Sequence, residues 1–235
     1  SDVCSSDLSA FPRVLLGHGA SLARAGFGTV VLTNGHGGPR HAAALEHACR
    51  RISRRHGIRM VTPSIRVLHR VMTGGRNDRL EQLLGRPLEP REREALVSGE
   101  HAGAWETSFM LATRPELVDP CYRDLGPLAP PRFRPLARIG EFVPPLRETT
   151  DQLAGSVGWL LNAHFGYGGA EVSWKGDPSV ATVEIGNAFK EILAEDCTAI
   201  VREVVSGALA PENVRSIASD HAVIQPGFFA RLALA

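Results

Sequence analysis

The stretch Thr29-Val30-Val31-Leu32-Thr33, followed directly by Asn34-Gly35-His36-Gly37-Gly38, decides how this chain is expected to fold. A β-branched apolar run that ends in glycines is typical of a buried strand with a tight loop after it. Glycine lacks a Cβ, so the loop can turn sharply and a ligand can approach its backbone closely. Open α/β sheets bind ligands beyond the carboxyl ends of their strands, and an imidazole held there can bind a metal or transfer a proton.

The segments on either side of this stretch predict the class of fold. We expect a helix over residues 14–25, ended by Gly26, and a second helix that begins at Pro39 and continues to about Arg55. A second strand is expected over residues 58–62. Short links between strand, helix and strand predict parallel strands joined by a right-handed crossover. The sequence therefore predicts a three-layer α/β/α sandwich with a mainly parallel sheet.

The later segments carry weaker signals. Residues 72–79 contain glycines, Asn and Asp and are expected to form a loop, whereas residues 91–97 are expected to form a short helix. Residues 115–145 are rich in proline, and so long an irregular stretch commonly covers an active site or makes subunit contacts. Asp177 is expected to cap a long helix that extends to about Ser206 and has a broad apolar face.

The composition is that of an ordinary globular protein, with 43% hydrophobic and 22% charged residues in a chain of 235. This length suffices for one sizeable domain. The formal net charge is +1, so no strong field directs the chain to nucleic acid or to an anionic membrane. The arginines within residues 50–55 are expected to form the solvated face of a helix. No apolar run in the sequence is long enough to span a bilayer.

The four cysteines lie far apart and form no CxxC pair, which argues against a disulfide framework and against a structural zinc knuckle. We therefore expect a cytoplasmic protein. Residues 1–8 have no initiating Met and no clear periodicity, so we expect them to be a non-native or disordered head. Residues 9–235 are expected to form a single domain.

A second chemically suggestive stretch is Glu100-His101-Ala102-Gly103-Ala104-Trp105-Glu106-Thr107-Ser108, which continues into an expected helix. His101 and Glu106 lie five residues apart, so they are not strict neighbours on one helical face. Both can still face one cavity if His101 precedes the helix and Glu106 lies in its first turns. Acidic residues near a helix start are also favoured by the helix dipole, which is a purely structural reason for Glu100 and Glu106.

Together these stretches resemble the creatininase family of metal-dependent amidohydrolases. The matching segments are residues 34–38, 101–108, 115–119 and 176–182, with Glu184 and Gly186 after the last. Each motif alone is weak, but several in the same order at plausible spacing are fairly specific. The resemblance implies a two-metal site, with Zn or Mn or both, and hydrolysis of an amide by a metal-activated water. It also implies a homo-oligomer, often a hexamer.

The resemblance implies roles for the first loop. His36 is expected to ligate a metal, although an isolated loop histidine often only bonds to the backbone. Asn34 is expected to hold the loop through side-chain hydrogen bonds, and Asn34, Gly37 and Gly38 are expected to line the substrate site. His41 and His47, on the helix that follows, receive no role.

The resemblance also implies roles for residues of the second stretch, 100–108. His101 is expected to pass a proton to the leaving nitrogen, and Glu100 either to orient its ring or simply to face solvent. Glu106 is the nearest acidic substitute for a glutamate ligand that the family has where this chain has Gly38. Alternatively, Glu106 has only a structural role, as a carboxylate at a helix terminus that accepts hydrogen bonds from the backbone. Trp105 is expected to line the substrate pocket or to pack in the core.

One feature of the family is absent from this chain. The family's first metal motif, a glutamate, a histidine and an aspartate within a short span near its N-terminus, has no counterpart before Asn34. We therefore expect an N-terminally truncated member that lacks the first strand and its metal motif and turns over poorly.

Two other functions remain open. The first is a peptidase or formamide deformylase of the same superfamily. The second is a non-catalytic α/β module in which residues 34–38 hold a phosphate at a helix start, although Pro39 and the lack of a following Lys or Ser/Thr weaken a P-loop interpretation. The expected partner is a small-molecule amide substrate, with no nucleic acid and no membrane.

Overall fold

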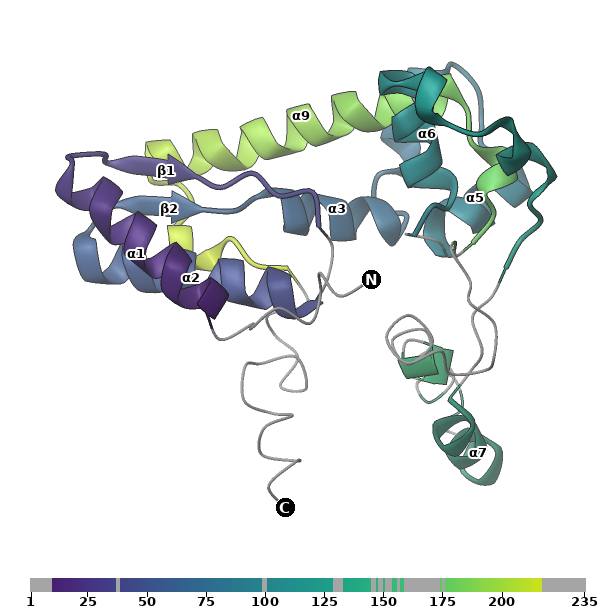
Figure 1. Ribbon diagram of the computed structural model, residues 1–235, viewed down its shortest axis with the longest axis horizontal. Coiled ribbons are helices and arrows are strands. Elements are labelled where there is room, and N and C mark those ends of the chain that lie inside the picture. The colour runs from purple at the N-terminus through teal and green to yellow at the C-terminus, as the bar shows by residue number, and fades with distance from the viewer. Residues whose placement is uncertain are drawn as a thin grey trace. The chain divides into compact units, whose positions relative to one another are not determined.

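The structure is a computed structural model, shown in Figure 1. It describes residues 10–36, 39–98, 101–128, 133–144, 147, 150, 154–155, 157–158, 174 and 176–216. The chain divides into two compact units. Unit 1 comprises the residues up to Arg76 together with those from Glu191 onward, and unit 2 comprises Asn77–Lys190. Each unit is described by itself.

Unit 1 is built on two parallel strands, β1 (Thr29–Val31) and β2 (Arg59–Val61), which helix α2 (Pro39–His56) connects. Helix α1 (Ala10–Arg24) precedes β1, and helix α3 (Ser64–Met72) follows β2. The predicted strand–helix–strand unit and its parallel pairing are therefore confirmed. Helix α3 was not predicted from the sequence.

Helices cover both faces of the strand pair. Met60 of β2 packs with Cys49 and Ile52 of α2. The next residue, Val61, points to the opposite face of the sheet and packs with Val204 of α9 (Val183–Ser206). Figure 1 shows α1 and α2 on one side of the strands and the C-terminal part of α9 on the other. The described sheet has two strands, so the α/β class with a parallel sheet is supported, and the complete three-layer sandwich stays a prediction.

Unit 2 is helical over most of the residues that the structure describes. Its helices are α4 (Asn77–Leu84), α5 (Pro90–Ser98), α6 (Ala104–Thr113) and α7 (Arg134–Phe142), with short 3-10 turns η2 (Pro115–Leu117), η3 (Pro120–Asp124) and η5 (Pro178–Val180). Helices α5 and α6 confirm the two helices predicted there.

Two helices of unit 2 correct expectations of irregular structure. Residues 72–79 were expected to form a loop, but α4 begins at Asn77, and its Leu80 is only 1% exposed. Burial of this apolar side chain outweighs the turn-forming residues before it. Helix α7 likewise forms within the proline-rich stretch, because Pro135 occupies its first turn, where a missing N–H costs nothing.

The expected cap at Asp177 exists but begins a different element. The Asp177 side chain accepts a hydrogen bond from Ser179 N at 3.1 Å and caps the turn η5. The backbone leaves helical geometry at Ala181, with φ −68° and ψ 135°. Helix α9 starts only at Val183, where Thr182 Oγ1 accepts from Ile185 N at 3.1 Å. The prediction of one long helix from Asp177 was therefore wrong by one short turn.

The Asp177 carboxylate makes stability depend on pH. It is 4% exposed and accepts hydrogen bonds from Arg91 Nε at 2.7 Å and Ser179 Oγ at 2.6 Å. Burial alone would raise the pKa of Asp177, but the bonds from Ser179 and Arg91 bring it below its ordinary value. A lowered pKa means that the carboxylate stabilises the fold above its unfolded pKa, about 4, and stops doing so as the pH falls through the folded value.

We therefore expect Asp177→Asn to lower the free energy of unfolding by about 1–3 kcal/mol near pH 7, because Arg91 loses a charged acceptor. The deficit should shrink as the pH falls below about 4. Urea denaturation across this pH range measures both values. Glu116→Gln is the matched control, because Glu116 pairs with Arg114 at an exposed site and should contribute little. A deficit that does not change with pH would contradict this account.

Two further observations bear on function. No helix of the described residues is both long enough and apolar enough to cross a membrane. The thiols of Cys49, Cys121 and Cys197 are free. Burial, followed by the neighbouring Glu46, raises the pKa of Cys49 to about 12, so this cysteine is a packing residue and not a nucleophile.

Candidate functional site

The loop after β1 is held by the side chain of Asn34. Asn34 Nδ2 donates to the carbonyl of His36 at 2.6 Å, and Asn34 Oδ1 lies 2.9 Å from His41 Nε2. Because the amide nitrogen is used as a donor, Oδ1 is the acceptor, and Nε2 carries the proton of the neutral His41 ring. Asn34 therefore holds the loop as predicted, and it also joins the loop to the start of α2.

A second imidazole backs the predicted metal ligand. The rings of His36 and His41 meet edge to face, with centroids 5.1 Å apart. Phe11 of α1 stacks on His41 at 4.5 Å. Burial and, to a smaller extent, His36 lower the pKa of His41, so His41 is neutral near pH 7. The loop thus presents one exposed imidazole, His36, against a neutral and partly buried one.

Sequence reasoning gave His41 no role. A signal was nevertheless present, since the helix was predicted to begin at Pro39. A histidine in the first turn of a helix lies beside the loop that leads into it. The ring contact between His36 and His41 therefore joins the loop to the first turn of α2.

The predicted site residues of unit 2 lie at the start of α6. His101 precedes the helix, Glu106 lies in its first turn, and both are exposed. Glu106 Oε2 accepts from Ala102 N at 2.8 Å, and Thr107 Oγ1 donates to Ala102 O at 3.1 Å. These bonds support Ala102 in a left-handed conformation, with φ 44°, that non-glycine residues seldom adopt. Glu106 therefore makes the backbone contact of the structural alternative, and its role as a metal ligand stays a prediction.

Trp105 makes the contacts of a core residue. It is 3% exposed, its Nε1 donates to Leu96 O at 2.6 Å, and its ring lies 4.7 Å from that of Phe189. A buried indole with a satisfied N–H is what a packed core requires. These contacts support the core alternative, while contact with a substrate is untested.

The motif segments around residues 101–108 and 176–186 meet inside unit 2. Ser108 is fully buried, and its Oγ accepts from Thr182 N at 3.1 Å. A Cβ added to Gly186 would lie 1.9 Å from Ser108 O, so only glycine allows α9 to approach α6 this closely. Gly186 thus has a packing reason to be where it is. Residues 101–108 and 176–186 therefore pack against each other within unit 2.

A shallow pocket of about 480 Å³ lies next to this contact. Its lining comes from the end of α6, from residues 115–123 and from residues 181–183. The described lining residues are largely apolar and include no histidine and no carboxylate. Arg123 lies over the ring of Tyr122 at 5.0 Å, so the cation among the described lining residues is already in contact with an aromatic face.

The predicted residues are divided between the two units. Asn34 and His36 belong to unit 1, whereas His101, Trp105 and Glu106 belong to unit 2. Glu100, Gly37 and Gly38 lie outside the described residues. Within the described part of the chain, no group of three or more His, Cys, Asp or Glu side chains is placed to hold a metal ion. These residues therefore do not by themselves complete a metal site, and the convergence of His36 and His101 on one site stays a prediction.

Comparison with known proteins gave one match. The family model described as "Creatininase: Creatinine amidohydrolase" matches residues 5–201. Neither a curated protein nor a solved structure matches this chain.

Proposed function

Because the chain belongs to the creatininase family, we propose that it hydrolyses the C–N bond of a small-molecule amide and requires a divalent metal ion, Zn or Mn, to do so. The match covers most of the chain and includes both motif stretches. The family is of the amidohydrolase type and generally metal-dependent, so a hydrolase is the coarse assignment. Beyond that assignment, we propose which bond is hydrolysed and which metal ion is required.

The observation that carries the proposal is the exposed imidazole of His36 at the carboxyl end of β1. Asn34 bonds both to the backbone of His36 and to His41 of α2, so the backbone at His36 is tied to the start of α2. A histidine whose loop is held in this way loses little entropy on binding a ligand. Because the described residues do not complete a metal site, we assign His36 as one donor and leave the others unassigned.

His101 is the proposed proton carrier. It is exposed at the start of α6, and the bonds of Ala102 to Glu106 and Thr107 hold the backbone beside it. An imidazole can both accept and donate a proton, which suits a group that must give a proton to a leaving nitrogen. We also propose that the protein acts as a homo-oligomer, which light scattering of the purified chain would test.

The test is metal-dependent stabilisation and hydrolysis by the purified chain. After chelator treatment, Zn²⁺ or Mn²⁺ should raise the melting temperature, since a ligand at a hundred times its Kd adds about 2.7 kcal/mol of stability. The same metals should support ammonia or amine release from a panel with cyclic amides, formamides and dipeptides. The substrate that is cut separates an amidohydrolase from a deformylase or a peptidase.

His36→Ala should lose both the metal-induced rise and the hydrolysis. His18→Ala is the matched control, because His18 is an exposed histidine of α1 outside the loop. If phosphate alone raises the melting temperature and metals do not, the proposal is wrong and a phosphate-binding module is favoured.

A further inference from the structure

The charge of this chain is distributed unevenly, although its formal net charge is only +1. Residues 10–76 contain eleven arginines and a single acidic residue, Glu46. Glu46 is 1% exposed, and its Oε1 accepts from Ser216 N at 2.8 Å. Its carboxylate therefore lies inside unit 1, and the surface formed by residues 10–76 carries cations with no anion among them.

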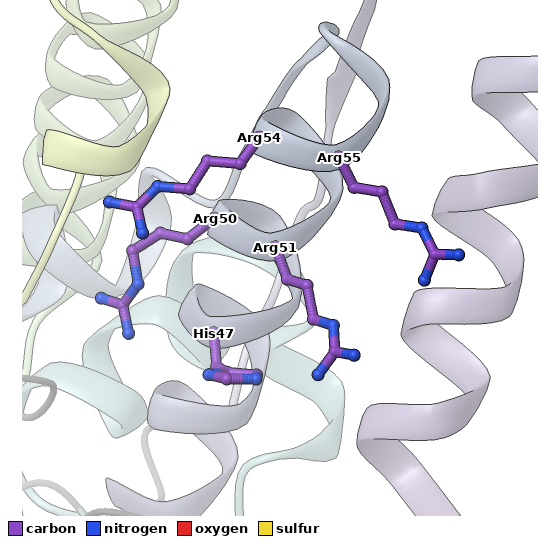
Figure 2. A pocket seen from close by; sticks show the side chains of 5 residues that line it. All are labelled: His47, Arg50, Arg51, Arg54 and Arg55. Atoms are coloured by element: carbon purple, nitrogen blue, oxygen red, sulfur yellow. The ribbon is translucent and has the colours of Figure 1, made fainter.

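Five of these basic side chains share one face of α2. His47, Arg50, Arg51, Arg54 and Arg55 line a shallow pocket of about 400 Å³. Their spacing of three and four residues places them on the same side of a helix. Figure 2 shows Arg50 and Arg54 on one side of this pocket and Arg51 and Arg55 on the other, with His47 at one end. Within each row the arginines are about 6 Å apart along the helix axis. We call these four arginines and His47 the α2 basic face.

Nothing in the described part of the chain neutralises the α2 basic face. None of its four arginines forms an ion pair with a described residue, whereas Arg76 of the same unit pairs with Asp196 at 2.9 Å. Like charges three or four residues apart cost a helix about 0.2–0.5 kcal/mol per pair. The positive field also reaches His47, because burial and then Arg50 and Arg51 lower its pKa.

We propose that the α2 basic face binds the phosphate backbone of a nucleic acid without reading its sequence. Guanidinium groups match phosphate oxygens in charge and geometry, and the two rows offer such groups at regular intervals. The face is open, with Arg51, Arg54, Arg55 and His47 all exposed. A small anion would stay largely hydrated on so shallow a surface, whereas a polyanion gains counterion release at every neutralised phosphate.

The side chains of the α2 basic face also explain why we expect binding to be independent of nucleotide sequence. Among the residues that the structure describes, the lining of the α2 basic face is arginine and histidine, with no Phe, Tyr or Trp on which a base could stack. Contacts confined to phosphates position a nucleic acid but carry no base information. Binding should therefore be similar for different sequences and should weaken steeply with salt.

The test is fluorescence anisotropy with labelled oligouridylate and with a labelled DNA duplex, between about 50 and 200 mM NaCl. In the complete chain, the combined substitutions Arg50→Gln, Arg51→Gln, Arg54→Gln and Arg55→Gln should weaken binding at least about tenfold at the lower salt concentration. Loss of four phosphate contacts should also flatten the slope of log K against log salt by about 3 for the single strand. The lysine counterparts of the same four substitutions should retain most of the binding, because the charge remains.

The matched control removes the same charge elsewhere. The combined substitutions Arg114→Gln, Arg134→Gln, Arg138→Gln and Arg202→Gln, all at exposed positions outside the α2 basic face, should leave binding close to wild type. Circular dichroism checks that each variant is folded, and the pairs Arg50/Arg54 and Arg51/Arg55 replace the fourfold variant if it is not. Absence of salt-dependent binding by the wild type, or equal loss in both fourfold variants, would overturn the proposal. Equally effective competition by polyglutamate or by tripolyphosphate would overturn it in favour of an acidic protein or a small anion.

Discussion

His101→Asn should lower kcat for amide hydrolysis about 10²–10⁴-fold, the usual contribution of a positioned acid or base. Asparagine keeps a polar group of similar size but cannot exchange a proton near neutral pH. The melting temperature should change little, because His101 is exposed. Steady-state kinetics of the metal-loaded chain on its best amide substrate, together with thermal denaturation, measure both quantities.

The pH profile separates a proton carrier from a residue that only supports the loop. If His101 transfers the proton, His101→Asn should change the shape of the pH profile of kcat, whereas loss of a residue that only supports the loop should lower kcat equally at every pH. His56→Asn, at the end of α2, is the control and should leave kcat and its pH profile unchanged. A His101→Asn protein with wild-type turnover would exclude this histidine from the reaction.

Gly186→Ala should be the most destabilising small substitution in unit 2. The new Cβ would lie 1.9 Å from Ser108 O, 2.5 Å from Ser108 C and 2.7 Å from the Ala112 Cβ. Two of these neighbours are backbone atoms of the buried helix α6, so no side-chain rotation relieves the clash. We expect a loss of about 3 kcal/mol or more in the free energy of unfolding, measured by urea denaturation, because the packed helices must move apart.

The control is another helical glycine with open space around it. Gly17 lies within α1, and a Cβ there would have no neighbour within 4 Å. Gly17→Ala should therefore stabilise the protein by about 0.5–1 kcal/mol, the ordinary gain in helix propensity. If Gly186→Ala is as stable as Gly17→Ala, the close approach of α6 and α9 described above is incorrect.

The elements that sequence could predict are those encoded by local signals. The β-branched run, the glycines after it and Pro39 sufficed for β1, α2 and their parallel partner β2. Helix α4 was missed because Gly74 and Gly75 suggested a longer loop, and α7 because prolines surround it. Helix α4 forms because Leu80 is buried, and α7 forms because a proline is tolerated in its first turn. Neither cause is visible as a local periodicity of the sequence.

The candidate site was predictable to a similar extent. The Asn34 hydrogen bond within the loop involves a residue two positions away and was anticipated from residue type. The pairing of His36 with His41, and the stacking of Phe11 on His41, depend on how α1 and α2 meet the loop. The sequence is compatible with two roles for Trp105, because burial decides between them and burial is a property of the folded chain.

The sequence by itself determined the family and the strand–helix–strand unit, because the order of the motifs and the local signals for strand, glycine loop and helix start can be read without the fold. The tertiary structure alone decided that Gly186 meets Ser108, since two segments far apart in the chain must pack to create that contact. It also decided that Glu46 is buried while the arginines of α2 remain at the surface. The excess of arginine over acidic residues within residues 10–76 is already visible in the sequence, but only folding decides which of these charges face solvent.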